Sequence, residues 1–77
     1  MIMYQPDIDR LGVDAFVNNI VAGVKEDLDG GQSTSFISEY YLKHYGIDVT
    51  VTLDTVNVRL YTESNGWNQS STKITRK

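Results

Sequence analysis

The side chains of this chain that could do chemistry are one histidine, three neighbouring tyrosines and a run of carboxylates. His44 is the only histidine, and the sequence contains no cysteine. A histidine that acts as a general base needs a nucleophile and an orienting acid within reach, and a metal site needs further ligands at suitable spacing. No such pattern surrounds His44. We therefore expect a structural histidine at the edge of the core, no enzymatic activity, no catalytic or metal-binding residues and no cofactor.

The carboxylates gather just before two consecutive glycines. Glu26, Asp27 and Asp29 precede these glycines, and the run Asp-Leu-Asp-Gly is typical of a calcium-binding loop. If the first glycine is the sixth residue of such a loop, Lys25 and Phe36 stand at the first and twelfth positions, where carboxylates are required. The spacing therefore excludes a calcium loop and leaves an acidic turn.

The tyrosines lie in a predicted helix that follows this turn. Tyrosine combines an apolar ring with a polar hydroxyl, so it is common both at the rim of a core and at interfaces. Of these two roles we favour the rim of the core, with the rings filling the space beside the sheet. Tyr45, at the end of the apolar arc, is expected to be exposed, as is Glu39 on the polar side. The predicted protein-binding residues are Glu26, Asp27, Asp29, Glu39 and Tyr45.

Formal charge is distributed unevenly along the chain, whose net charge is −3. Residues 1–54 carry nine acids and three bases, a net charge of −6, whereas residues 55–77 carry four bases and one acid, a net charge of +3. A basic C-terminal region suggests an alternative function, nucleic-acid binding by the last hairpin and the tail. The residues predicted to take part are Arg59, Lys73, Arg76 and Lys77.

Two helices followed by a hairpin are superficially similar to a winged helix. A recognition helix should be basic, because phosphate contacts dominate affinity for nucleic acids. The second predicted helix has only Lys43 and Glu39 on its polar side. Nucleic-acid binding therefore remains the alternative hypothesis.

Hydrophobic periodicity predicts two helices. The first helix begins at Asp14, its expected N-cap, and has six apolar residues at helical spacing that form a stripe wide enough to face a core: Phe16, Val17, Ile20, Val21, Val24 and Leu28. Gly23 interrupts this helix, which suggests the close approach of the second helix or of a dimer mate. The second helix is predicted from Ser35, its expected N-cap, to Tyr45, with Gly46 ending it. Its expected core residues are Phe36, Ile37 and Tyr40.

After Gly46 the period changes to two, which predicts a strand over residues 47–53. The apolar phase then shifts by one residue at Asp54-Thr55, which favours a hairpin turn over a bulge in one long strand. Asn65-Gly66 predicts a second, two-residue hairpin turn, in which Trp67 faces Ser64 and Ser71 faces Leu60. The third strand is then a polar edge strand.

The sequence thus predicts an α+β fold in which two helices pack on one face of a three-stranded antiparallel meander, in the order ααβββ. Residues 1–77 form a single domain; residues 1–6 are expected to be a tail or a short edge strand containing Ile2 and Tyr4, and residues 68–77 to fray. The segment between them and the first main helix, Asp7 to Gly12, is expected to be a turn or a single helical turn. A homodimer would supplement the small core that 77 residues allow. No basic leader or membrane-spanning apolar run is present, so we expect a cytoplasmic protein.

The composition and pattern together favour a non-enzymatic protein-binding domain. Our hypothesis is a small inhibitor, encoded by a phage or mobile element, that covers a basic nucleic-acid-binding surface of an enzyme. The expected partner is therefore a protein, such as a nucleic-acid-processing enzyme, and not a membrane. Nucleic acid is a partner only under the alternative hypothesis.

Overall fold

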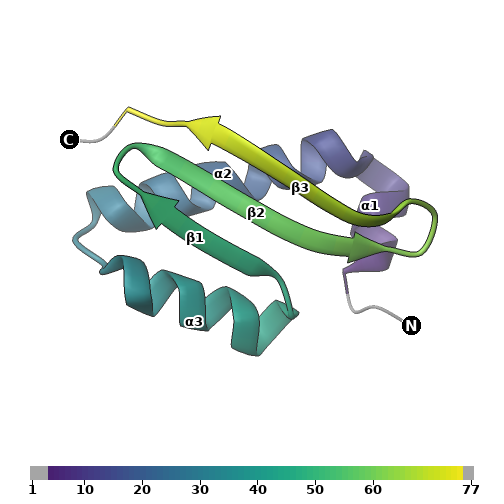
Figure 1. Cartoon of the computed structure of the whole chain (residues 1–77), viewed down its shortest axis with the longest axis horizontal. Helices are drawn as coiled ribbons and strands as arrows, with labels where there is room; N and C mark the ends of the chain where they lie inside the picture. The colour runs from purple at the N-terminus through teal and green to yellow at the C-terminus, as the bar shows by residue number, and fades with distance from the viewer. Residues whose placement is uncertain (1–3, 76–77) are drawn as a thin grey trace.

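Three helices precede three strands in the computed structural model of the chain, which describes residues 4–75 (Figure 1). The elements are α1 (Gln5–Leu11), α2 (Val13–Asp29), α3 (Thr34–Tyr45), β1 (Asp48–Thr52), β2 (Thr55–Thr62) and β3 (Gly66–Lys73). The strands form one antiparallel sheet in the order β1-β2-β3. The predicted α+β class and the order of helices before a meander are confirmed.

The core lies between α2 and the inner face of the sheet, and α3 closes it beside β1 (Figure 1). All six apolar residues predicted for the first main helix are buried, because they form one stripe along α2. The sheet contributes alternate residues, as expected for strands with one covered face. The buried apolar residues are Tyr4, Ile8, Phe16, Val17, Ile20, Val21, Val24, Leu28, Ile37, Ile47, Val49, Val56, Val58 and Leu60.

The helix ends differ from the predicted ends by one or two residues. Gly12, with φ 88°, precedes α2, so Asp14 lies in its first turn and is not the N-cap. A carboxylate there still interacts favourably with the helix dipole. Ser33, rather than Ser35, caps α3, and its Oγ accepts a hydrogen bond from the backbone N–H of Phe36 at 3.1 Å. Gly46 ends α3 with φ 69°, as predicted.

The N-terminal segment is the seven-residue helix α1, attached to the sheet, where the sequence predicted a tail or short edge strand and then a turn or a single helical turn. The hydroxyl of Tyr4, directly before α1, donates to the backbone carbonyl of Tyr61 at 2.7 Å and accepts from its N–H at 3.1 Å. The pairing of β1 with β2 ends at Asp48 opposite Arg59, so Tyr4 takes the place of a strand partner for Tyr61. Ile2, the other residue of the predicted edge strand, lies outside the described residues.

A two-residue turn joins β1 to β2, which confirms the hairpin over the bulge. Thr52 pairs with Thr55, so Leu53 and Asp54 form the turn, one residue earlier than predicted. Leu53 has φ 55° and is 85% exposed. The turn explains the change of apolar phase, since it lets Val51 and Val56 share the inner face.

The second hairpin has a wider turn than predicted. Gly66 has φ 74°, but within residues 4–75 Leu53 is the one non-glycine residue with a positive φ, so Asn65 does not form the two-residue turn that Asn-Gly favours. Instead, Thr62 pairs with Gly66, and the buried Thr62 hydroxyl accepts from the Asn65 N–H at 2.9 Å.

This wider turn changes the register of β3 by three residues. Trp67 faces Tyr61 instead of Ser64, and Leu60 faces Asn68 instead of Ser71. The predicted register put Trp67 on the same face as Leu60; the observed one puts it on the outer face, 62% exposed, while Ile74 packs against the core. As predicted, β3 is a polar strand at the edge of the sheet. It pairs with β2 as far as Lys73, within the segment predicted to fray.

Candidate functional site

The feature best suited to binding is a depression between α2 and α3 with a volume of about 440 Å³. It combines carboxylates from α2 with aromatic rings from α3, and we call it the acidic groove. Its lining residues are Gly23, Glu26, Asp27, Gln32, Phe36, Tyr40, Tyr41 and Tyr45.

Gly23 brings the two helices close together at the floor of the acidic groove. A Cβ atom on Gly23 would lie 3.1 Å from the hydroxyl oxygen of Tyr41, closer than most real contacts. The missing side chain therefore allows the Tyr41 hydroxyl to reach α2. The predicted close approach at Gly23 is confirmed, and the approaching element is α3.

The rings of α3 form a continuous row on the other wall. Tyr40 is its centre, with ring centroids 6.5 Å from Phe36, 5.6 Å from Tyr41 and 6.1 Å from Tyr45. Phe36 is 52% exposed and Tyr40 42% exposed, so the prediction that both belong to the core was wrong. The reason is that α3 packs through one row of side chains, Ile37 and Tyr41, which leaves the neighbouring row in solvent.

His44 belongs to this exposed row rather than to the core edge. Its side chain is exposed, and its ring lies 4.6 Å from that of Tyr40. The prediction that His44 is a structural histidine at the edge of the core was therefore wrong. His44 extends the aromatic surface by one helical turn.

The carboxylate of Asp27 lies close enough to the tyrosines to affect their ionisation. The pKa of Tyr41 is raised above its ordinary value mainly by burial, and then by the charges of Asp27, Tyr45 and Tyr40. The pKa of Tyr40 is raised first by electrostatic repulsion from Tyr45 and by a hydrogen bond with that side chain, with smaller effects from desolvation and Asp27. The groove therefore holds neutral phenols beside a negative charge.

These shifts predict how stability depends on pH. The folded state holds both phenolic protons more tightly than the unfolded chain, so the associated stability is fully present below the ordinary pKa of 10.0 and is lost as the pH rises through the folded pKa values. Urea unfolding followed by circular dichroism between about pH 9 and pH 12 measures this loss. The double variant Tyr40→Phe/Tyr41→Phe should show a shallower decline; an unchanged decline would contradict the assignment.

The groove brings together three of the five predicted protein-binding residues, Glu26, Asp27 and Tyr45. Asp29 is not one of them, because its carboxylate accepts from Lys25 Nζ at 2.9 Å and its side chain is only 16% exposed. Lys25 and Asp29 are four residues apart on one helix, and this spacing in the sequence already indicates an ion pair. Glu39 is exposed as predicted, but it lines a different depression, beside Thr50 and Val51.

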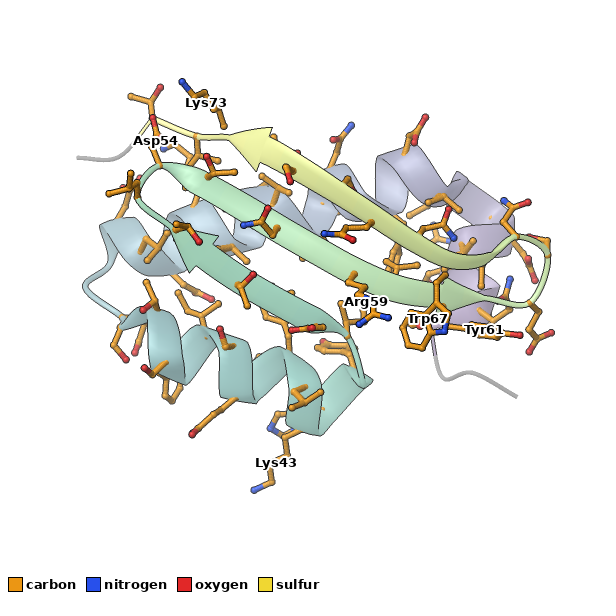
Figure 2. All side chains as sticks on the ribbon, viewed as in Figure 1. Lys43, Asp54, Arg59, Tyr61, Trp67 and Lys73 are labelled. Carbon is orange, nitrogen blue, oxygen red and sulfur yellow. The ribbon has the colours of Figure 1, made fainter. Side chains whose placement is uncertain are left out.

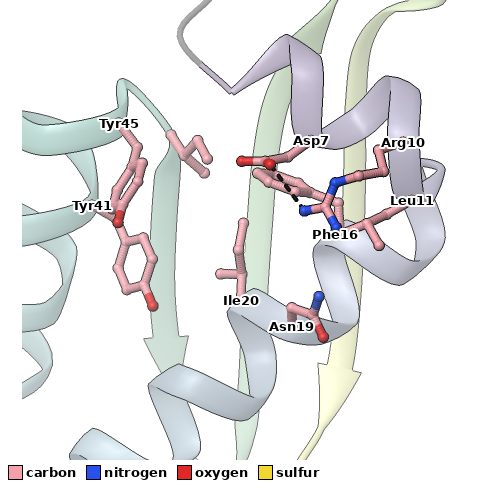
Figure 3. Close-up of a pocket in the computed structure, with 9 residues that line it drawn as sticks. Asp7, Arg10, Leu11, Phe16, Asn19, Ile20, Tyr41 and Tyr45 are labelled. Atoms are coloured by element: carbon pink, nitrogen blue, oxygen red, sulfur yellow. Dashed lines mark hydrogen bonds and ion pairs between the residues drawn. The ribbon is translucent and has the colours of Figure 1, made fainter.

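A second depression adjoins the acidic groove, with a volume of about 290 Å³ (Figure 3). Tyr41 and Tyr45 line both depressions and stand between them. The far wall belongs to α1, where Arg10 donates to Asp7 at 3.2 Å. The tyrosines thus present two sides to solvent, one acidic and one bordered by an ion pair.

The residues of the alternative hypothesis do not form one cluster. Arg59 and Lys73 both lie on the outer face of the sheet (Figure 2), but Arg59 faces Gln69 whereas Lys73 faces Thr55. Four strand positions separate these pairs, roughly 13 Å along the sheet. Arg76 and Lys77 lie outside the described residues.

Sequence reasoning grouped Arg59 with Tyr61 but missed the ring that contacts Arg59. Its guanidinium carbon lies 4.6 Å from the ring centroid of Trp67, and that ring lies 5.6 Å from the ring of Tyr61. The predicted register separated Trp67 from both residues. Thr62, four positions before Gly66, was the signal for the wider turn that joins them.

In the part of the chain that the structure describes, no group of three or more histidine or carboxylate side chains is placed to hold a metal ion. None of the helices of residues 4–75 has the length and apolar character needed to span a bilayer. Comparison with protein-family models, curated proteins and solved structures finds no significant match to this chain. Its function must therefore be inferred from the geometry.

Proposed function

We propose that this chain is a non-enzymatic protein-binding domain whose acidic groove receives a basic segment of a partner protein. One observation carries the proposal: Glu26 and Asp27 on α2 line the same depression as the exposed aromatic row of α3. Carboxylates alone would be a solvated helix face, and exposed rings alone would be common on a small protein. Carboxylates and rings together suit a ligand that carries a positive charge at the end of a long alkyl chain.

Lysine and arginine side chains fit these two walls. Their alkyl stems pack along apolar surface while the charged end stays in a polar environment. In the groove, a stem would lie on Phe36 and Tyr40, and the cation would reach Glu26 or Asp27. A cation over the face of an aromatic ring is further stabilised by the ring's electron distribution, and a charged hydrogen bond is stronger than a neutral one.

The charge distribution suggests which partner surface is bound. Residues 1–54 have a net charge of −6, and proteins that hold nucleic acids line their binding surfaces with lysine and arginine. A chain that covers such a surface would compete with the nucleic acid. This supports the more specific proposal of a small inhibitor of a nucleic-acid-processing enzyme.

The proposal is tested with a defined basic ligand. An unstructured peptide rich in lysine and arginine is titrated into the isotopically labelled protein, and a peptide of equal length with glutamine at the basic positions is the control ligand. NMR shift changes should concentrate at Gly23, Tyr40 and Tyr45. Neutralising the groove with Glu26→Gln/Asp27→Asn should weaken binding by about tenfold or more, because charged hydrogen bonds are lost.

A matched variant removes the same charge elsewhere. Asp48→Asn/Asp54→Asn neutralises two exposed carboxylates of the β1–β2 hairpin, and it should change the affinity by less than about twofold, as expected for distant screened charges. Equal weakening by both double variants would show that net charge alone attracts the peptide. That result, or shift changes spread over the whole surface, would refute the acidic groove as the binding site.

A further inference from the structure

The outer face of the sheet carries a compact group of three side chains, which we call the Trp67 cluster: Arg59, Tyr61 and Trp67 (Figure 2). Tyr61 and Trp67 face each other across β2 and β3, with ring centroids 5.6 Å apart and planes at 71°. The guanidinium carbon of Arg59 lies 4.6 Å from the centroid of the Trp67 ring. Two backbone pairings therefore place two rings and one cation side by side.

The Trp67 cluster is not part of the core. Trp67 is the only tryptophan of the chain, yet its side chain is 62% exposed, and Tyr61 is 41% exposed. A tryptophan buries more apolar surface than any other residue when it is placed in a core. Here it contributes a large, accessible ring on the surface instead, in contact with Arg59 and Tyr61.

The surroundings of the cluster are polar and carry charges of both signs. Gln69 follows Trp67 on the outer face of β3, and further along the Ser71 hydroxyl donates to the Asn57 side chain at 2.6 Å. Asp48 faces Arg59 from β1. The carboxylates of the acidic groove, by contrast, belong to α2, which lies behind the sheet in this view.

We infer that the Trp67 cluster binds the unpaired bases of a single-stranded nucleic acid. Exposed rings on an antiparallel sheet stack on bases of any sequence, since every base presents a flat aromatic face. Arg59 is placed to contact the phosphate that follows a stacked base, and Gln69 can hydrogen-bond to base edges. Double-stranded DNA is the poorer ligand, because its bases are already stacked and none of the three helices within residues 4–75 is basic, as a helix in the major groove should be.

Fluorescence tests the inference directly, because all tryptophan emission comes from Trp67. At low salt, twelve-nucleotide oligothymidine and oligouridine should quench this emission in a saturable way. A twelve-unit abasic sugar-phosphate chain has the same backbone charge without bases and should leave it nearly unchanged. Anisotropy of a dye-labelled oligothymidine then gives affinities for variants that lack tryptophan.

Variants separate stacking from charge. Trp67→Ala should weaken binding between about 5-fold and 150-fold, the range for loss of one base–aromatic stack, and Trp67→Phe should restore part of the loss. Phe36→Ala removes an exposed ring from the acidic groove and should have no effect. Arg59→Gln should make the slope of log affinity against log salt concentration shallower by about 0.7 for each phosphate contact that is lost. Lys43→Gln, an equal charge change on α3, should leave this slope unchanged.

Three results would overturn the inference. One is equal binding of the abasic chain and oligothymidine; another is oligothymidine binding that survives Trp67→Ala unchanged. The third is an emission that responds to the concentration of the protein itself and not to oligonucleotide, which would assign the outer face to a second copy of the chain. Each of these readouts is independent of the basic-peptide test of the acidic groove.

Discussion

Replacing Ile37 with alanine should lower the free energy of unfolding by about 2–5 kcal/mol, the usual range for truncating a buried isoleucine. Of the residues of α3, all of which the structure describes, Ile37 alone is buried, with 1% of its surface exposed. Tyr41 is the one further partly buried hydrophobic residue of α3 that packs against the core. Loss of the Ile37 side chain therefore removes the main attachment of α3 to the core.

Urea denaturation followed by circular dichroism measures this effect, and Leu42→Ala is the matched control. Leu42 is on the same helix, has the same number of carbon atoms as Ile37 and is 61% exposed. Its truncation should change stability by no more than about 0.5 kcal/mol. If both variants lost the same stability, α3 would not be held to the core through Ile37.

Replacing Tyr4 with alanine should be at least as damaging, at about 3–5 kcal/mol for the loss of a buried aromatic ring. The Tyr4 ring packs edge-on against Phe16 with centroids 5.6 Å apart, and its hydroxyl serves both backbone groups of Tyr61. A domain of this size has a core that supplies only about 3–5 kcal/mol of stability. We therefore expect Tyr4→Ala to be largely unfolded at 25 °C.

Tyr4→Phe separates the hydrogen bonds from the packing. The ring stays, but the N–H and carbonyl of Tyr61 lose their partner, which should cost about 1–3 kcal/mol. Thermal unfolding followed by circular dichroism should rank the proteins as wild type, then Tyr4→Phe, then Tyr4→Ala. A Tyr4→Phe variant as stable as wild type would mean that water replaces the hydroxyl without loss.

Local signals predicted most of the fold. The stripe of α2 identified its buried residues because a wide apolar arc has one way to face a sheet. Gly46 marked the end of α3 because few residues other than glycine adopt the left-handed conformation there. In each case the deciding interactions lie within a few residues of one another.

The error in α3 arose because distant parts of the chain decide between two local alternatives. The wheel of α3 has two adjacent apolar rows, and the position of β1 and α2 determines that the row containing Ile37, and not the row of Phe36 and Tyr40, is buried. The error at Asn65-Gly66 is local instead: this pair favours a two-residue turn in isolation, but the buried Thr62 hydroxyl, three residues before Asn65, stabilises a wider one.

The candidate site was predicted in parts and not as a unit. Glu26, Asp27 and Tyr45 were each expected at a binding surface, but their meeting in one groove depends on the contact between Gly23 and Tyr41. The Trp67 cluster was not predicted, because a register error of three residues moves a side chain to the other face of a sheet.

The contact between Tyr4 and Tyr61 also has a consequence for the order of events during synthesis. The two residues are 57 positions apart, so the ribosome has made α1, α2, α3 and β1 before the partner of Tyr4 exists. Contacts this distant in sequence form only after the intervening chain has been brought together. Until β2 is in place, the nascent chain therefore carries α1 without this attachment to the sheet.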